Sequence, residues 1–307
     1  MNKPIFVMMV GLPGSGKSTY AKELSRRINA KICGSDAIRE ELTGDINSQT
    51  SNEEVFKLLH NRIKEHLRNG ENVIYDATNI NYKRRMSFIQ ELNKISCEKV
   101  CVLMATTYEQ CLKNNSLRDR IVPKGVIERM YRTFDVPWYY EGWDNIWVEY
   151  TPYSEGSLGW AREWVESVKF YNQDNSHHAL TLGSHCWQTV KYLDRHIPDT
   201  ASPTELRCAA MIHDCGKPFC KTFANTKGEI TEQAHYYGHE RTGSYDSLFY
   251  EMACSNLRAA VLIRWHMQPY FWEKDNNEKS HDKYRKLWGE GLYRDVMQLH
   301  EADKKAH

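Results

Sequence analysis

No apolar run of 18 residues occurs in this 307-residue chain, so the sequence predicts no membrane span. The nine cysteines include no CxxC pair, which indicates reduced thiols and a cytoplasmic location. Residues 1–4 lead directly into an apolar stretch, without the pattern of a secretory signal. An excess of charge is also missing, since 41 basic side chains stand against 40 acidic ones. A nucleic-acid substrate is therefore expected in a local groove and not on a broad basic face.

The most specific motif lies between an apolar stretch at 5–10 and a helical pattern. It is GLPGSGKST, with the G-x4-G-K-S spacing of a phosphate-binding loop. In such loops the glycines let backbone N–H groups approach a phosphate, the lysine reaches the β- and γ-phosphates, and the serine hydroxyl ligates Mg²⁺. The alternative is a glycine-rich turn with an incidental lysine. We predict a site for ATP or GTP with Mg²⁺, formed by Gly11, Gly14, Ser15, Gly16, Lys17, Ser18 and Thr19.

Strand-like and helical patterns alternate as far as about residue 150. Such alternation predicts an α/β domain with a parallel sheet and helices on both faces. Ligands of these folds bind at the carboxyl ends of the strands. The strands are expected at 5–10, 30–33, 72–76, 100–105 and 146–149, and the helices at 17–29, 52–69, 81–96, 107–115 and 124–134.

Two expected strand ends carry a carboxylate. Asp36 follows the second strand and is a candidate base for the proton of an acceptor hydroxyl, while Arg39 lies on the same helix face and could hold an acceptor phosphate. Asp76 ends the third strand, where enzymes that transfer phosphoryl groups from a phosphate-binding loop place a carboxylate near the Mg²⁺ waters. Helix capping by Asp36 is the alternative, and it is compatible with catalysis. Arg84 and Arg85 have the simpler interpretation of solvated helix charge.

The polar segment 114–123 lies between helical patterns and is expected to form a lid. Its two arginines, Arg118 and Arg120, could bind the nucleotide and neutralise charge that develops on the transferred phosphoryl group. The alternative is an exposed turn with a cluster of charges.

GLPGSGKST, SDAIR, YDATN, the lid arginines and VPKGVIERMYRTFDVPWYYEGWD together resemble the polynucleotide-kinase branch of the P-loop kinases over residues 4–150. The resemblance implies that Asp36 activates a 5′-hydroxyl and that Arg39 contacts the 3′ side of the acceptor. The family usually has two lid arginines four residues apart. Arg118 matches the second, whereas the first falls on Asn114, and Arg120 is a candidate to compensate. Related P-loop kinases act on small molecules, so a small acceptor stays open.

The segment 150–159 has turn residues and no periodicity, so we place a domain boundary there, with domains at 1–152 and 153–307. Helical patterns dominate the second domain and predict an all-α fold. They cover 159–171, 181–195, 204–213, 238–253, 256–267 and 290–306.

Eleven of the 13 histidines lie at position 177 or later, a clustering typical of metal sites. His213 and Asp214 end an apolar helix, and such a pair is costly to bury unless it is paired or metal-bound. With His185 before it and Asp303 after it, this order resembles the HD phosphohydrolase superfamily over about residues 176–307.

The resemblance implies one divalent metal on His185, His213, Asp214 and Asp303, and in members with two metals a second on His239 and His266 with Asp214 bridging. Carboxylates mixed with imidazoles suit Mn²⁺, Mg²⁺, Co²⁺, Ni²⁺ or Fe²⁺. Lys217 is expected to steady the phosphate or the leaving group.

Other candidates in this domain are weaker. His235 would lie on a helix with His239 as an outer or surface residue, His178 is a candidate to line the pocket, and His300 is left out of the metal set. The aromatic stretch from Trp265 to Trp272 is expected to pack in the core or at the pocket edge, with base stacking as the alternative.

A P-loop kinase joined to a metal phosphoesterase is a combination found in end-healing enzymes. The sequence therefore favours a bifunctional enzyme that phosphorylates a 5′-hydroxyl of RNA or DNA and removes a 2′,3′-cyclic phosphate or a 2′- or 3′-phosphate. A ligase would act next on such ends. The alternatives are a kinase–phosphohydrolase of nucleotides or another small metabolite, and a nucleotide-sensing binding module.

Overall fold

The structure is a computed structural model, and it describes residues 3–44, 52–176, 179–196, 203–275 and 278–306. The chain divides into two compact units. The first contains Met1–Ile127 and Pro137–Thr151, and the second contains Glu128–Val136 and Pro152–His307. Our boundary at 152/153 assigned 128–136 to the first domain. This segment belongs to the second unit because Tyr131 and Asp135 bond to Asp246 and Arg264 there.

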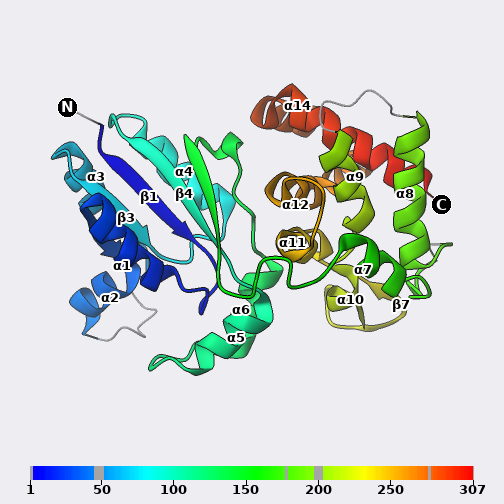
Figure 1. Ribbon diagram of the computed structural model, residues 1–307, viewed down its shortest axis with the longest axis horizontal. Helices are drawn as coiled ribbons and strands as arrows, with labels where there is room; N and C mark the ends of the chain where they lie inside the picture. The colour runs from blue at the N-terminus through cyan, green and yellow to red at the C-terminus, as the bar shows by residue number, and fades with distance from the viewer. Residues whose placement is uncertain (1–2, 45–51, 177–178, 197–202, 276–277, 307) are drawn as a thin grey trace. The chain divides into compact units, whose positions relative to one another are not determined.

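A five-stranded parallel sheet forms the centre of the first unit, with the strand order β2-β3-β1-β4-β5. In Figure 1, β1 lies between β3 and β4. The strands are β1 (Ile5–Val10), β2 (Ala30–Gly34), β3 (Asn72–Asp76), β4 (Glu98–Ala105) and β5 (Asn145–Tyr150). This order and the parallel pairing confirm the predicted parallel sheet. The prediction succeeds because apolar stretches buried on both faces are typical of central parallel strands.

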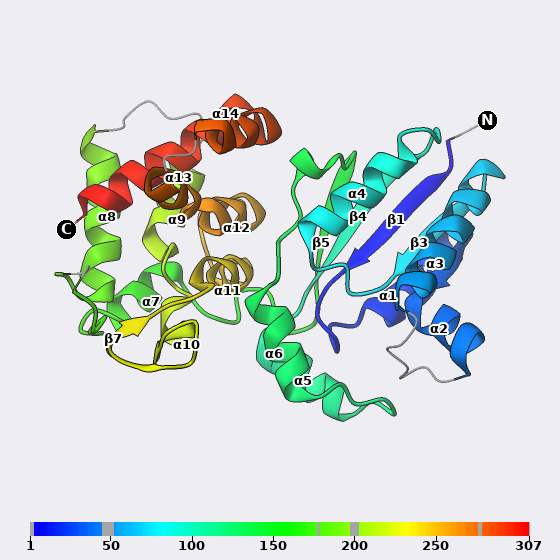
Figure 2. The ribbon, with the colours of Figure 1, turned by 180° about the vertical axis from the view of Figure 1, so that it is seen from behind.

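Helices cover both faces of this sheet, as its alternating side chains require. On one face, Val7 and Met9 pack with Ala21 and Leu24 of α1 (Lys17–Ile28). On the other, Phe6 meets Phe88 of α4 (Tyr82–Leu92), and the ring of Phe88 also stacks on a histidine of α3 (Asn52–Arg68). The reverse view in Figure 2 shows α3 and α4 together with the strands.

Other helical segments of the first unit follow β2, flank residues 117–123 or precede β5. They are α2 (Ser35–Thr43), α5 (Tyr108–Ser116), the 3₁₀ helix η1 (Tyr139–Glu141) and the start of α6 (Lys124–Arg132). Thr107 caps α5, since its side chain accepts a hydrogen bond from the Gln110 backbone N–H.

The second unit is mainly helical. Its helices are α7 (Ala161–Ser167), α8 (Leu182–His196), α9 (Pro203–Ile212), α10 (Lys217–Cys220), α11 (His239–Asp246), η2 (Ser247–Phe249), α12 (Asn256–Trp265), α13 (Gln268–Asp275) and α14 (Glu278–Lys305). Within the unit, α8, α9, α12 and α14 pack against one another. The last helix is kinked at Gly289, whose φ is 76°.

Three expectations for this unit are wrong in detail. It is not all-α, because β6 (Thr222–Ala224) and β7 (Ile230–His235) form an antiparallel pair. His235 therefore lies on a strand and not on a helix with His239. The single helix expected at 238–253 ends at Asp246 and continues only as η2, after which Tyr250 has an extended backbone. No helix among the described residues is both long and apolar enough to cross a membrane.

Candidate phosphate-binding site and metal centre

The loop between β1 and α1 has a backbone that requires glycine. Gly14 has a φ of +83°, and a Cβ there would lie 2.3 Å from the carbonyl oxygen of Cys111 in α5. Gly16 has a φ of +86° and is the residue before the first turn of α1. Both are in the left-handed region that side chains disfavour. The loop therefore turns sharply and leads into a helix N-terminus, a geometry that binds phosphate.

Lys17 closes over this loop. Its Nζ donates to the Leu12 carbonyl at 2.7 Å and to the Ser15 hydroxyl at 3.3 Å. Burial lowers the pKa of Lys17 to about 8, although Asp76 at the end of β3 partly opposes this shift. A phosphate in the loop would offer the ammonium group a stronger acceptor than a carbonyl. Ser18 and Thr19 are exposed and accessible to a nucleotide or to Mg²⁺.

Asp36 is held by two guanidinium groups. Its Oδ1 lies 3.2 Å from Nη1 of Arg39, one turn along α2, and 2.8 Å from Nη1 of Arg120. Arg39 is buried while Asp36 stays half exposed, so the carboxylate faces outward between the two cations. The structure thus brings the candidate base together with the candidate acceptor-binding residue and one of the lid arginines.

The segment expected to form a lid begins on α5, where the Asn114 side chain bonds to the phosphate loop. Its Nδ2 donates to the Gly14 carbonyl at 2.9 Å, and its Oδ1 accepts from Gln110. The next residue, Asn115, is buried and bonds to both backbone groups of Val122, which closes the loop 115–122. Arg118 is exposed in this loop, and its charge opposes protonation of Lys17.

The expectation that Arg85 is a solvated helix charge is wrong. Its side chain is 1% exposed, and its Nε and Nη2 donate to the two Glu141 oxygens at 2.7 and 2.6 Å. Its Nη1 donates to the Asn79 carbonyl at 2.8 Å. Asn79 in turn donates to the carbonyl of Met9, just before the phosphate loop. Arg85 therefore supports the strand ends that flank the site, whereas Arg84 is exposed as expected.

Six side chains in the second unit meet in two adjacent groups. His185, His213 and Asp303 form one group, and Asp214, His239 and His266 form the other. In each group the potential ligand atoms lie within 4.8 Å of one another, and all six residues are buried. They come from α8, from the turn after α9, from the start of α11, from the end of α12 and from α14. The six residues are those that the HD resemblance implied as ligands.

Asp214 presents one oxygen to each group. Its Oδ2 lies 3.4 Å from Nε2 of His213 and 3.6 Å from Nε2 of His185. Its Oδ1 lies 3.2 Å from Nε2 of His239 and 3.9 Å from Nε2 of His266. On the far side of the first group, Asp303 Oδ1 is 2.9 Å from His185 Nε2.

The four imidazoles share an orientation suited to a metal. Each Nδ1 lies near a backbone carbonyl oxygen, at 3.3 Å for His185, 2.8 Å for His213 and His239, and 2.7 Å for His266. When Nδ1–H of a neutral ring donates to a carbonyl, Nε2 is unprotonated and its lone pair can bind a metal ion. The Nε2 atoms of His185 and His213 lie 3.2 Å apart, and those of His239 and His266 lie 3.3 Å apart. Two lone pairs at such a distance require a proton or a metal ion between them.

The charges of these buried residues also favour a cation among them. Burial opposes ionisation of Asp214, but Lys217 and His213 outweigh it and hold the pKa of that carboxyl well below its usual value. Burial lowers the pKa of His266 to about 3, so its ring is neutral. Asp214 Oδ2 is buried without a hydrogen bond of good geometry. Buried carboxylates together with imidazole nitrogens fit a divalent cation such as Mn²⁺, Fe²⁺ or Co²⁺.

Lys217 lies next to the centre. Its Nζ is 2.7 Å from Asp214 Oδ2 and donates to Gln173 Oε1 at 2.8 Å. Gly216, just before Lys217, lets this turn pack closely on α11, because a Cβ there would lie 2.2 Å from the His239 carbonyl oxygen. Lys217 is thus positioned beside the carboxylate, and Gln173 is a neighbour that the sequence did not reveal.

Residues 6–137 match the AAA domain family model. An L-seryl-tRNA(Sec) kinase from Methanococcus maripaludis is 32% identical over 146 residues, which cover 46% of this chain and 56% of that protein. The chain therefore spans little more than half the length of this relative. Together with the parallel sheet and its flanking helices, these matches identify a kinase-like P-loop domain in the N-terminal half.

Solved structures similar to the chain include the Pnkp1/Rnl/Hen1 RNA repair complex and a gluconokinase from Sinorhizobium meliloti 1021. The first is 26% identical with a TM-score of 0.37, over 42% of this chain and 43% of that one. The second is 15% identical with a TM-score of 0.36, over 50% and 85%.

Trp265 and Trp272 pack in the core against Trp288, as expected. Tyr270, from the same stretch, instead donates to Asp303 Oδ2 at 3.2 Å, a contact that the sequence did not reveal. His300 bonds to Glu273 outside the metal set. His178 lies outside the described residues.

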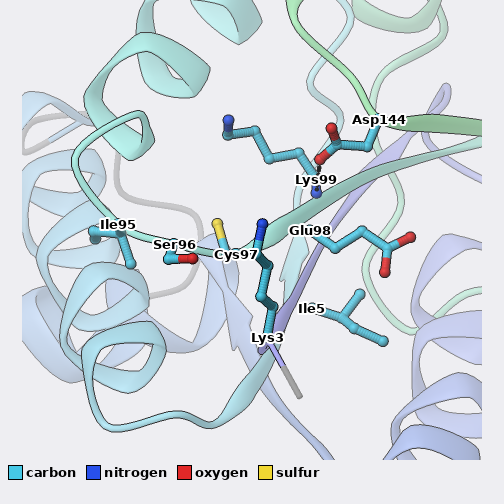
Figure 3. Close-up of a pocket in the computed structure, with 8 residues that line it drawn as sticks. All are labelled: Lys3, Ile5, Ile95, Ser96, Cys97, Glu98, Lys99 and Asp144. Atoms are coloured by element: carbon cyan, nitrogen blue, oxygen red, sulfur yellow. Dashed lines mark hydrogen bonds between the residues drawn. The ribbon is translucent and has the colours of Figure 1, made fainter. Parts of the chain in front are cut away.

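Figure 3 shows an open hollow at the amino ends of β1 and β4, on the edge of the sheet opposite the phosphate loop. Its Asp144 carboxylate accepts a hydrogen bond from the Lys99 backbone N–H. This hollow contains none of the predicted site residues. It is lined by Lys3, Ile5, Ile95, Ser96, Cys97, Glu98, Lys99 and Asp144.

Proposed function

We propose that this chain is a bifunctional end-healing enzyme for RNA or DNA. One activity transfers the γ-phosphate of ATP or GTP to a 5′-hydroxyl, and the other removes a 2′,3′-cyclic phosphate or a 2′- or 3′-phosphate. The observation that carries the proposal is that one chain holds a P-loop site with a carboxylate between two arginines and a buried centre of four histidines and two aspartates. Both classes of site act on phosphate, one by adding it and one by removing it.

In the kinase, Asp36 accepts the proton of the attacking hydroxyl, and Arg39 holds the acceptor beside it. The half-exposed position of Asp36 leaves its carboxylate accessible to an incoming hydroxyl. Lys17 stabilises the charge of the β- and γ-phosphates. Ser18 and Asp76 are the residues that would face Mg²⁺.

The lid arginines have separate tasks in this proposal. Arg118 interacts electrostatically with Lys17, and in this proposal it acts on the phosphoryl group. Arg120 holds Asp36 until the acceptor enters. Asn114 cannot replace an arginine there, because its amide is already bonded to the Gly14 carbonyl.

In the phosphoesterase, His185, His213, Asp214 and Asp303 would hold one divalent metal, and His239 and His266 a second, with Asp214 shared. Such a metal supplies Lewis acidity toward a phosphate and activates water. Lys217 would steady the phosphate or the leaving group from its place beside Asp214.

The products of the two activities, a 5′-phosphate and a 3′-hydroxyl, are the ends that a ligase joins, so we propose a ligase as the functional partner. A second candidate for the kinase acceptor is a hydroxyl carried on tRNA. It is favoured by the 32% identity to an L-seryl-tRNA(Sec) kinase.

The kinase assay supplies γ-labelled nucleoside triphosphate with three acceptors, which are a 5′-hydroxyl oligonucleotide, seryl-tRNA and mononucleosides. Label on the oligonucleotide supports end healing. Label only on seryl-tRNA supports the second candidate, and label only on mononucleosides supports a metabolic kinase. An Asp36→Asn variant controls for contaminating kinase.

The phosphoesterase assay uses a strand ending in a 2′,3′-cyclic phosphate, with Mn²⁺ or Co²⁺ added after chelation. Metal content by elemental analysis should fall in His185→Ala and Asp214→Ala. Full metal content in both variants, or cleavage that persists in them, would refute this half of the proposal.

A further inference from the structure

Asp303 uses its two carboxylate oxygens for different purposes. Oδ1 faces the imidazoles, 2.9 Å from His185 Nε2 and 3.5 Å from His213 Nε2. Oδ2 accepts the hydroxyl of Tyr270 at 3.2 Å. A carboxylate can rotate about its last bond, so the group that holds one oxygen decides where the other points.

Tyr270 is itself held in place from two directions. Its ring meets that of His300 edge-on, with centroids 4.4 Å apart, one turn before Asp303 on α14. Two residues further along α13, Trp272 is buried against Trp288 from the first half of α14. Helix α13 therefore contacts α14 on both sides of the kink at Gly289, which fixes the Tyr270 hydroxyl relative to Asp303.

We propose that Tyr270 is the positioning residue of the metal centre, and that its hydroxyl holds Asp303 Oδ2 so that Oδ1 points to the metal ion. This inference rests on the metal centre of the proposed function. Partners of metal ligands orient the ligand and reduce the freedom lost on binding. Because the Tyr270 hydroxyl bonds to Asp303, which belongs to the group with His185 and His213, we expect its effect to be confined to that group.

The test is Mn²⁺ binding to the full chain after chelation, measured by titration calorimetry and by the electron paramagnetic resonance signal of free Mn²⁺. Tyr270→Phe keeps the ring and removes the hydroxyl. We expect it to weaken Mn²⁺ binding by about 10–100-fold. The chelated variant should unfold at the temperature of the chelated wild type, while its stabilisation by Mn²⁺ should be smaller.

Tyr192→Phe is the matched control. The Tyr192 hydroxyl donates to a carboxylate of the same helix, Glu301 Oε1, at 2.8 Å, but Glu301 is not in either ligand group. Glu273→Gln is a second control, since it disturbs contacts from α13 to His300 and Lys304 without touching Asp303. Both variants should bind Mn²⁺ as the wild type does.

Asp214→Asn separates the two possible failures. If it binds Mn²⁺ as tightly as the wild type, the ion is elsewhere, and the metal centre and the role of Tyr270 both fall. If it loses binding but Tyr270→Phe retains wild-type affinity, only the role of Tyr270 is overturned. Equal weakening in Tyr270→Phe and Tyr192→Phe would also overturn it, because a general loosening of α14 would then explain the loss.

Discussion

Replacing Glu141 with alanine should strongly destabilise the first unit. Arg85 and Glu141 form a two-pronged ion pair that is almost fully buried, and Trp143 donates to the same carboxylate at 3.0 Å. Glu141→Ala leaves the guanidinium of Arg85 buried without its counter-charge. Breaking a buried pair in this way costs roughly 3–5 kcal/mol in the free energy of unfolding.

The effect should extend to the phosphate loop. Arg85 also donates to the Asn79 carbonyl, and the Asn79 side chain donates to Met9, at the end of β1. We expect the loss to be measurable by hydrogen exchange of peptides from β1, β3 and β4, which report on this unit separately from the other. Nucleoside triphosphate binding should weaken in the same variant.

Glu41→Ala is the matched control. Glu41 makes the same two-pronged contact with Arg62, at 2.7 and 2.5 Å, but this pair is exposed to solvent. Its loss should leave hydrogen exchange unchanged within error, because exposed pairs contribute little. Equal effects of the two substitutions would refute the argument from burial. A double variant, Arg85→Met with Glu141→Leu, should recover much of the lost stability, since it removes the unpaired charge.

Three further predictions concern the sites. Affinity for nucleoside triphosphate should fall above about pH 8, because Lys17 of the free protein is then neutral while the phosphates bind its charged form. Lys17→Ala should abolish both phosphoryl transfer and this pH dependence. Titrations of affinity between pH 7 and 9.5 check this, and a flat profile would contradict it. At saturating donor, Arg118→Ala should lower kcat more than Arg120→Ala, whereas a larger loss for Arg120 would show that it acts on the phosphoryl group. Asp36→Ala should lower kinase activity by about 10²–10⁴ and spare the phosphoesterase, while Asp214→Ala should do the reverse; both activities are assayed on both variants, and loss of both in one folded variant would mean that the sites are coupled.

The phosphate loop and the sheet were predictable because both depend on neighbouring residues. Positive φ at Gly14 and Gly16 is available at little cost only to glycine, so the motif specifies the turn locally. Apolar runs separated by helical patterns predict buried parallel strands without knowledge of their partners. The order of the candidate ligands could likewise be recognised along the chain.

The supporting contacts could not be predicted in this way. Nothing local distinguishes Arg85, which is buried on Glu141, from its exposed neighbour Arg84. The same holds for Tyr270 and for Gln173, whose partners Asp303 and Lys217 are distant in sequence. Each contact depends on which helix faces which, and a single sequence does not specify that pairing.

The sequence alone therefore determined the glycine-dependent phosphate loop, the alternating α/β pattern and the set of histidines and aspartates. The tertiary structure decided that Asp214 offers one oxygen to each of two groups, that Arg120 meets Asp36, and that 128–136 completes the second unit. The physical reason is how far apart in the sequence the residues lie that set each feature. Backbone conformation and burial pattern are set by residues a few positions apart, whereas the six candidate metal ligands meet only because side chains from residue 185 to residue 303 are packed together.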